Sequence, residues 1–236
     1  MTYICPVLKN LKEMPGKLEK FADFERFENC FAFAFEQIPQ GFPIKGKWRE
    51  DVFKNQHPLI LELGCGKGEY TVGLGEANPG KNYIGVDVKG NRIWTGAIYA
   101  LDHKLGNIAF LRTRIDFIEH CFSEGEVDEI WITFPDPQPQ KPRARKRLTN
   151  QRFLYRYHKI LKPNGIIHLK TDSTSLYEYT LEVITENKHE LIWHTDDLYK
   201  NCPADRKELI TIKTYYENLF HSRGEDIKYI AFRLSH

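Results

Sequence analysis

The chain has 236 residues, of which 41% are hydrophobic and 28% charged, and its formal net charge is +2 at pH 7. This composition supplies a globular core and excludes gross disorder, and the small net charge does not by itself indicate a nucleic-acid partner. No apolar run approaches the roughly 18 residues that a membrane span needs, so we expect no membrane association.

The start of the chain and its cysteines indicate the compartment. The stretch MTYICPVLKNLKEMPGK lacks the charged-then-apolar pattern of a signal peptide. The five cysteines, at positions 5, 30, 65, 121 and 202, are scattered and form no C-x-x-C pair. Neither a disulfide framework nor a zinc ribbon is indicated. We therefore expect a cytoplasmic protein with reduced thiols.

Residues 1–55 differ in composition from the rest and are predicted to form an N-terminal extension, partly helical, that packs on a main domain of residues 56–236. The stretch FADFERFENCFAFAF, residues 21–35, is rich in aromatic residues and is predicted to be helical. IPQGFPIKGK, which follows it, is typical of a loop.

The main domain alternates between strands and helices. Seven strands are predicted, at residues 59–63, 83–87, 108–113, 129–134, 165–170, 190–195 and 227–234. Helices are predicted at about 69–78, 91–105, 116–120, 149–161 and 174–187. Such alternation is typical of parallel β-α-β units. The sequence therefore predicts an α/β fold, a doubly wound, mostly parallel seven-stranded sheet with helices on both faces.

A glycine-rich loop follows the first strand of this domain. In LELGCGKGEY the glycines Gly64, Gly66 and Gly68 alternate with other residues. Open α/β sheets bind ligands at the carboxyl ends of their strands, where this loop lies. Glu62 at the end of the strand would repel a pyrophosphate, so the G-x-G-x-G pattern favours a ligand with a cationic end, such as S-adenosylmethionine.

Two further acids follow the next two strands. Asp87 ends the second strand, where a carboxylate can accept hydrogen bonds from both ribose hydroxyls, and Asp116 follows the third, within reach of an adenine edge. Each could instead be an ordinary capping residue beside a tight turn. The combination with the glycine loop favours a donor site. The pattern E-x-G-x-G-x-G resembles the class I S-adenosylmethionine-dependent methyltransferases, which implies a Rossmann-like fold and leaves the substrate open.

The loop after the fourth strand indicates the substrate class. Asp136 lies between Pro135 and Pro137, which stiffen the backbone and suit a side chain that must point into a site. A run of cations follows at once: Lys141, Arg143, Arg145, Lys146 and Arg147. Alone, such a run is most simply a solvated loop. Beside a methyl donor, it favours a polyanionic substrate whose phosphates it positions.

Motifs in order from about Trp48 to the C-terminus resemble the bacterial tRNA (guanine-N7-)-methyltransferases. They are HPLILELGCGKGEYT, IGVDVKGNRI, FPDP with its basic run, HLKTDSTSLYEY and IKTYYEN. The resemblance implies S-adenosylmethionine contacts at Glu62, Asp87, Asp116 and Asp136, the last also catalytic. It implies substrate contacts at Asp172, Thr214, Tyr215, Tyr216 and Glu217. The implied reaction is methylation of N7 of a guanine in tRNA, which the family finds in the variable loop.

The chain departs from the family pattern after F-P-D-P. Gln138 stands where the family usually has Trp, and the family's substrate-binding lysine falls at Gln140, with Lys141 next. We expect Lys141 to take that role. The second-strand acid, often Glu in the family, is Asp87 here.

Guanine N7 carries a lone pair and no proton, so this reaction needs positioning and electrostatics rather than a general base, and no metal is expected. Three alternatives remain: a methylase of an exocyclic amine, a non-enzymatic RNA-binding protein on the same scaffold, and a small-molecule methyltransferase. The first favours [DN]-P-P-[FYW] after the fourth strand, the second would have lost donor residues, and the third leaves the basic run without a purpose. We expect tRNA as the partner and a monomer or a homodimer.

Overall fold

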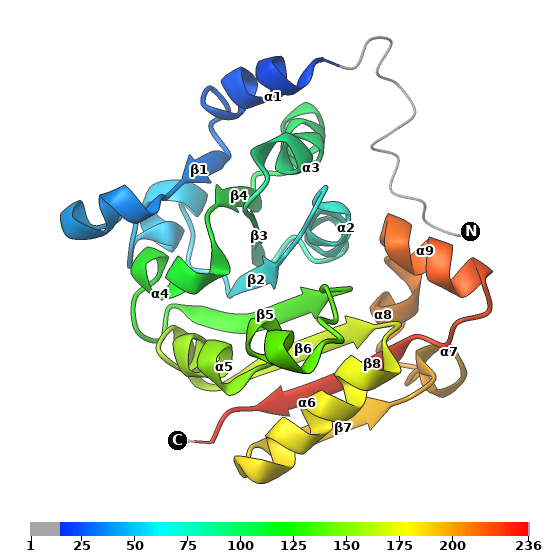
Figure 1. Cartoon of the computed structure of the whole chain (residues 1–236). Helices are drawn as coiled ribbons and strands as arrows, with labels where there is room; N and C mark the ends of the chain where they lie inside the picture. Colours follow the sequence, from blue (N-terminus) through cyan, green and yellow to red (C-terminus); the bar gives the residue numbers. More distant parts are fainter. Residues whose placement is uncertain (1–14, 236) are drawn as a thin grey trace.

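The computed structural model describes residues 15–235, which form one eight-stranded sheet with helices on both faces (Figure 1). The strand order is β1-β4-β3-β2-β5-β6-β8-β7. The strands are β1 (Cys30–Ala32), β2 (Leu59–Leu63), β3 (Asn82–Asp87), β4 (Ile108–Arg112), β5 (Val127–Thr133), β6 (Leu161–Thr171), β7 (Glu190–Thr195) and β8 (Lys228–Arg233). The first six strands in this order are parallel, and β8 runs antiparallel to both β6 and β7.

The doubly wound, mostly parallel sheet is confirmed, but the prediction of seven strands is wrong by one. The additional strand is β1, which pairs in parallel with the edge of β4, Cys30 opposite Phe110. It lies in the aromatic stretch for which a helix was predicted, and that helix ends at Phe24. A three-residue strand is too short to show an alternating pattern, so only its pairing with β4 reveals it.

Helices cover both faces of the sheet (Figure 1). The longer ones are α1 (Lys17–Phe24), α2 (Glu69–Ala77), α3 (Gly90–Asp102), α5 (Gln151–His158), α6 (Thr174–Glu186) and α9 (Tyr215–Ser222). Short helices are η2 (Phe35–Gln40), η3 (Trp48–Phe53), η4 (Ile115–Phe117), α4 (Ile118–Cys121), η5 (Lys141–Lys146), α7 (Leu198–Asn201) and α8 (Glu208–Thr211). Among the described residues, no helix is long and apolar enough to cross a membrane.

The alternation of side chains along the strands divides the core between the two faces. Leu59, Leu61 and Leu63 of β2 belong to the core cluster that takes in α4, α5 and α6. Ile60 points to the other face, where it packs with residues of α2, α7 and α8. All five residues of β2 are buried, as expected for a central strand covered by helices on both sides.

The N-terminal segment packs against the first of these faces through Trp48. Its indole stacks on Phe122 at 5.3 Å and meets Phe31 edge-on at 5.1 Å. Its Nε1 donates a hydrogen bond to the carbonyl oxygen of Cys121 at 3.0 Å. The indole therefore has both an apolar enclosure and a partner for its polar atom.

The sheet topology fixes where a ligand site lies. β2 lies between β3 and β5, so the chain first winds outward through β3 and β4 and then returns to the other side of β2. The loops after these strands therefore meet at the carboxyl edge of the sheet, at the point where the strand order reverses. Ligands of open α/β sheets bind at this point.

Candidate active site

Two cavities open at this edge. The larger, of about 710 Å³, is lined by the glycine loop, the loop around Asp136 and the start of α9, and we call it the glycine-loop cavity. The second, of about 500 Å³, is lined by residues that follow β3 and β4, and we call it the Asp87 cavity. Both are lined by Gly64, Lys146 and Leu148, so the two cavities are neighbours.

The three loop glycines all have left-handed backbone angles, with φ of +80°, +57° and +76°. A Cβ added at Gly66 would meet nothing within 4 Å, and one at Gly64 only Leu148 at 4.0 Å. A Cβ at Gly68 would lie 2.6 Å from the ring of Phe110. Gly64 and Gly66 thus leave room for a ligand beside the backbone, whereas Gly68 lets the start of α2 pack tightly and does not line either cavity.

Glu62 is buried beneath the glycine loop. Its Oε2 accepts hydrogen bonds from the backbone N–H of Thr71, at 2.8 Å, and from the Thr71 hydroxyl. Its Oε1 accepts one bond from the Thr133 hydroxyl at 2.6 Å. Burial raises the pKa of this carboxyl to about 7, although these hydrogen bonds act to lower it. Glu62 lines the glycine-loop cavity, where Oε1 retains a lone pair for a cationic group.

Asp87 and Asp116 both line the Asp87 cavity. Asp87 accepts hydrogen bonds from the N–H of Gly66 at 3.0 Å and of Lys89 at 2.8 Å, so it also fixes the glycine loop. Asp116 lies between two guanidiniums, those of Arg114 at 3.4 Å and of Arg152. The structure brings both acids to the same cavity.

The loop after β5 holds Asp136 in an unusual backbone conformation. Phe134 and Gln138 have φ of +47° and +44°, a region that residues other than glycine rarely adopt. The N–H of Phe134 donates to the carbonyl of Lys170 at 2.8 Å, and Asp136 accepts a bond from the N–H of Gln138 at 3.0 Å. Such local strain clusters at functional sites. Asp136 is exposed and lines the glycine-loop cavity.

Arg147 stabilises the loop around Asp136 through hydrogen bonds to its backbone. Its guanidinium donates hydrogen bonds to the carbonyls of Pro137 at 3.2 Å and Gln138 at 3.3 Å, and lies over the ring of Tyr179 at 4.3 Å. The side chain is buried. Arg147 was predicted to contact a phosphate of the substrate. In the structure it instead lies under the Asp136 loop and supports it.

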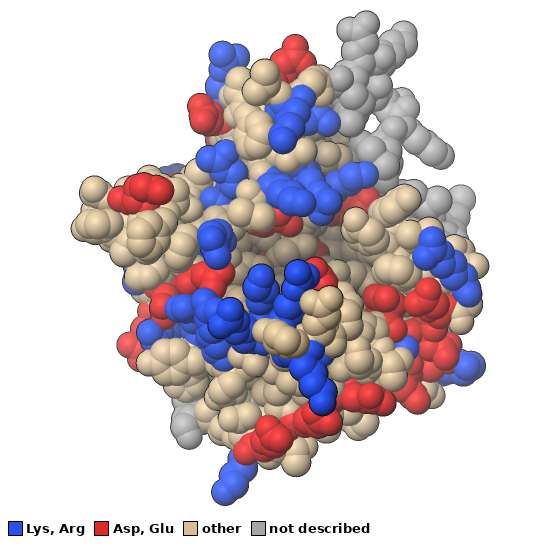
Figure 2. Space-filling model, in the orientation of Figure 1, with Lys and Arg blue, Asp and Glu red and all other residues tan. Residues whose placement is uncertain are grey.

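The other members of the basic run are exposed on η5 (Figure 2). Figure 2 shows Lys and Arg side chains gathered on the near face, below a central hollow that has further cations on its upper side. Lys146 lines both cavities. The remaining predicted residues lie on the surface beside the cavities without lining them: Gln140, Lys141, Arg143 and Arg145.

The T-Y-Y-E element divides into two parts. Thr214 caps α9 by accepting a bond from the N–H of Glu217, and it lines the glycine-loop cavity together with the exposed Tyr215 and Tyr216. Glu217 does not line the cavity. It is fully buried, and both its oxygens accept hydrogen bonds from Nζ of Lys170 at 2.9 Å. Glu217 therefore anchors α9 to β6.

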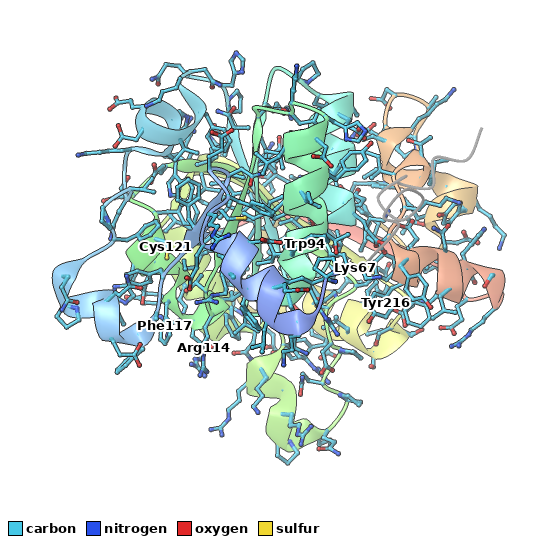
Figure 3. The ribbon with its side chains drawn as sticks, turned by 90° about the horizontal axis from the view of Figure 1, so that it is seen from above. Lys67, Trp94, Arg114, Phe117, Cys121 and Tyr216 are labelled. Atoms are coloured by element: carbon cyan, nitrogen blue, oxygen red, sulfur yellow. The ribbon has the colours of Figure 1, made fainter. Side chains whose placement is uncertain are left out.

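Further residues line the glycine-loop cavity that the sequence analysis did not single out: Lys67, Glu69, Arg92, Leu148 and Phe220. Nζ of Lys67 lies 5.6 Å from the ring of Tyr215, and Glu69 accepts a hydrogen bond from the N–H of Tyr215 at 2.7 Å. Figure 3 shows Lys67 and Tyr216 on the same side of the molecule. The position of Lys67 inside the glycine loop was the signal that could have identified it.

Asp172, the remaining predicted substrate contact, also lines this cavity. Burial raises the pKa of its carboxyl above the usual value. Among residues 15–235 there is no group of three His, Cys, Asp or Glu side chains that could hold a metal ion. The cavity is thus lined by acidic groups near the glycine loop and by aromatic rings and cations at its mouth.

A family model described as a putative methyltransferase matches residues 56–230. The tRNA (guanine-N(7)-)-methyltransferase of Christiangramia forsetii is 50% identical over 93% of this chain and 98% of its own. That of Bacteroides thetaiotaomicron is 51% identical over 93% of this chain and 86% of its own. The chain belongs to this methyltransferase family. The resemblance seen in its motifs is thereby confirmed, and with it the assignment as an enzyme.

Among solved structures, the 16S rRNA methyltransferase KamB superposes with a TM-score of 0.60 and 14% sequence identity, over 79% of this chain and 92% of its own. A 30S ribosomal A1408 methyltransferase from an uncultured bacterium gives 0.55 and 16%, over 81% and 98%. At this identity the likeness shows the fold alone. It confirms the Rossmann-like methyltransferase fold.

Proposed function

We propose that the protein transfers a methyl group from S-adenosylmethionine to N7 of a guanine in the variable loop of tRNA, in the cytoplasm. The observation that carries the proposal is the convergence of the glycine loop and the strained Asp136 loop on one cavity, with a band of cations at its mouth. Membership in the family agrees with it, because relatives named for this reaction match over nearly their whole length.

The residues at the carboxyl edge fit this donor. The open space beside Gly64 and Gly66 admits a ligand against the backbone, Glu62 offers a carboxylate oxygen to its ammonium group, and Asp87 offers two oxygens to ribose hydroxyls. Asp116 supplies an acceptor for the amino edge of adenine. When bound, the donor supplies a methyl group on a sulfonium, which a lone pair displaces without acid or base catalysis.

The acceptor side fits a purine. Guanine N7 attacks with its own lone pair, and the ring gains positive charge as the bond forms. The Asp136 carboxylate stabilises that charge and can accept hydrogen bonds from the guanine edge, since its Oδ2 has no partner among the described residues. Tyr215 and Tyr216 offer ring faces at the cavity mouth, on which a base taken out of its stack can pack.

The test is to incubate tRNA with the protein and a labelled methyl donor, digest the product and identify the methylated nucleoside. We expect 7-methylguanosine, and we expect it to disappear when the variable-loop guanine is replaced. The matched variant is Asp136→Asn, which keeps the shape and removes the charge. Its methylation rate should fall by roughly 10²-fold or more while donor affinity persists.

Other outcomes of this assay would distinguish the alternative functions. An N-methylated exocyclic amine would reassign the protein to a different nucleobase position. Donor binding without any methylated RNA, although the tRNA binds, would favour a non-enzymatic RNA-binding protein. Normal single-turnover methylation by Asp136→Asn would leave Asp136 with a structural role only.

A further inference from the structure

A third hollow adjoins the Asp87 cavity. It has a volume of about 780 Å³ and is lined by Phe33, Phe35, Arg114, Phe117, Arg152 and Arg156, among others. We call it the aromatic groove. Of its lining residues, the mechanism proposed above uses only Asp116. It lies between η2 of the N-terminal segment and the residues of η4, α4 and α5.

The groove carries an exposed aromatic platform. Phe35 at the start of η2 is 64% exposed, and its ring centroid lies 5.7 Å from that of Phe117. The guanidinium of Arg114 lies over the other ring, 5.6 Å from its centroid. Aromatic and guanidinium planes side by side form the surface on which single-stranded nucleic acid stacks its bases.

The lining of the groove carries a small excess of positive charge, with four arginines, Arg112, Arg114, Arg152 and Arg156, against three acids, Glu36, Asp116 and Glu119. Asp116 is shared between Arg114 and Arg152, whose side chains are 64% and 49% exposed. Glu119 is likewise shared, between Arg156 and Lys159. In each case one carboxylate faces two cations. This excess of positive charge favours a polyanionic partner over an uncharged, apolar one.

The groove is continuous with the donor site. It shares Val88, Thr113, Arg114, Asp116 and Arg152 with the Asp87 cavity, which in turn adjoins the glycine-loop cavity. In Figure 3, Arg114 and Phe117 lie toward the left of the view, and Lys67 and Tyr216 lie to the right of centre. Two aromatic and cationic surfaces thus flank the donor site along the same edge of the sheet.

We infer that the aromatic groove is a second contact site for the substrate RNA, which takes an unpaired nucleotide of the same tRNA whose guanine enters the glycine-loop cavity. The base stacks on Phe35 and Phe117, and the phosphate meets Arg114 and Arg152. The inference rests on the proposed function for the identity of the RNA. The aromatic groove would add a site at which the protein binds the RNA away from the reacting base.

The decisive variant is Phe35→Ala, because Phe35 lines the groove and neither of the two cavities. Its matched control is Tyr155→Ala, an aromatic residue that is 62% exposed and has Nζ of Lys159 over its ring at 4.7 Å, outside all three hollows. Kd for unmodified tRNA is measured over a range of salt concentrations, and Kd for S-adenosylmethionine by calorimetry.

Loss of one stacked base should weaken tRNA binding by Phe35→Ala about 5- to 100-fold, with an unchanged salt slope. Phe35→Trp should restore the affinity. Arg114→Ala should instead lower the slope of log affinity against log salt by about 0.7–0.9. Phe35→Ala should bind the methyl donor normally, and Tyr155→Ala should match the unaltered protein in both affinities.

Two results would overturn the inference. Equal tRNA affinities for Phe35→Ala and Tyr155→Ala, with methylation intact, would exclude the groove as an RNA-binding site. The proposed function would be unaffected by that result. A loss of donor affinity in Phe35→Ala without a loss of tRNA affinity assigns the groove to the donor or to another small molecule. If the unaltered protein neither binds nor methylates tRNA, the proposed function itself fails, and that outcome is distinct from the first two.

Discussion

Replacing Glu62 by Gln removes the buried charge under the glycine loop and keeps its partners. The amide oxygen of Gln can accept both bonds that Thr71 now donates to Oε2. Its amino group can donate to the hydroxyl of Thr133, which then acts as the acceptor. The change therefore tests the ionisation of this side chain rather than its packing.

The magnitude follows from the pKa. Burial raises the pKa of Glu62 from 4.5 to about 7, so the folded protein holds the proton more tightly than the unfolded chain. Its ionisation therefore costs stability as the pH rises from about 4.5 to about 7, and the cost is constant above that. This rise in pKa corresponds to about 3 kcal/mol of unfolding free energy. The stability of Glu62→Gln relative to the unaltered protein should rise by about 2–3 kcal/mol between pH 5 and pH 8.

The assay is urea unfolding of the donor-free protein at several pH values, with Glu178→Gln, a change of an exposed side chain, as the control. The same variant should bind S-adenosylmethionine more weakly, because the ammonium group loses its carboxylate. A stability difference for Glu62→Gln that does not grow with pH would refute the argument that burial dominates the ionisation of Glu62.

Three other changes test the rest of the site. Asp87→Ala should lower the affinity for S-adenosylmethionine by roughly tenfold to a hundredfold with the fold intact, since the ribose acceptors are lost at a cost of about 1–3 kcal/mol; unchanged calorimetric affinity would remove it from the site. Lys170→Met should destabilise the protein to urea by about 3–5 kcal/mol, because it leaves Glu217 buried without a cation, and Lys170→Met with Glu217→Leu should recover most of that loss. Three exposed cations of the basic run line neither cavity: Lys141, Arg143 and Arg145. Replacing all three with Ala should weaken tRNA binding and flatten its salt slope by roughly two units without changing donor affinity, whereas an unaltered slope would leave the run as a solvated surface.

The sequence was sufficient to predict the strands, helices and loops that depend on a local pattern of residues. The strand at Leu59–Leu63, the glycine loop and the position of Asp136 follow from apolar runs, glycine spacing and proline stiffness, which act over a few residues. These features predict a ligand site at the carboxyl edge of the sheet, and the glycine-loop cavity opens at that edge.

The orientation of the charged side chains could not be predicted in the same way. Glu217 is buried with an ion-pair partner because the fold brings it to Lys170, which lies 47 residues earlier, near the end of β6. Arg147 turns inward because the Pro137 and Gln138 carbonyls and the ring of Tyr179 surround it. Such placements depend on partners that only the folded chain brings together, so a basic or acidic motif does not reveal which of its members face the solvent.

The strand β1 and the indole of Trp48 have a consequence for the integrity of the whole sheet. β1 covers the outer edge of β4, and Trp48 closes the core beside it. A chain that began at residue 56 would expose the unpaired N–H and C=O groups of β4 next to an opened apolar surface. Exposed edges of this kind recruit strands from other molecules and promote aggregation. The N-terminal segment thus covers a sheet edge that would otherwise be open to pairing with other copies of the chain.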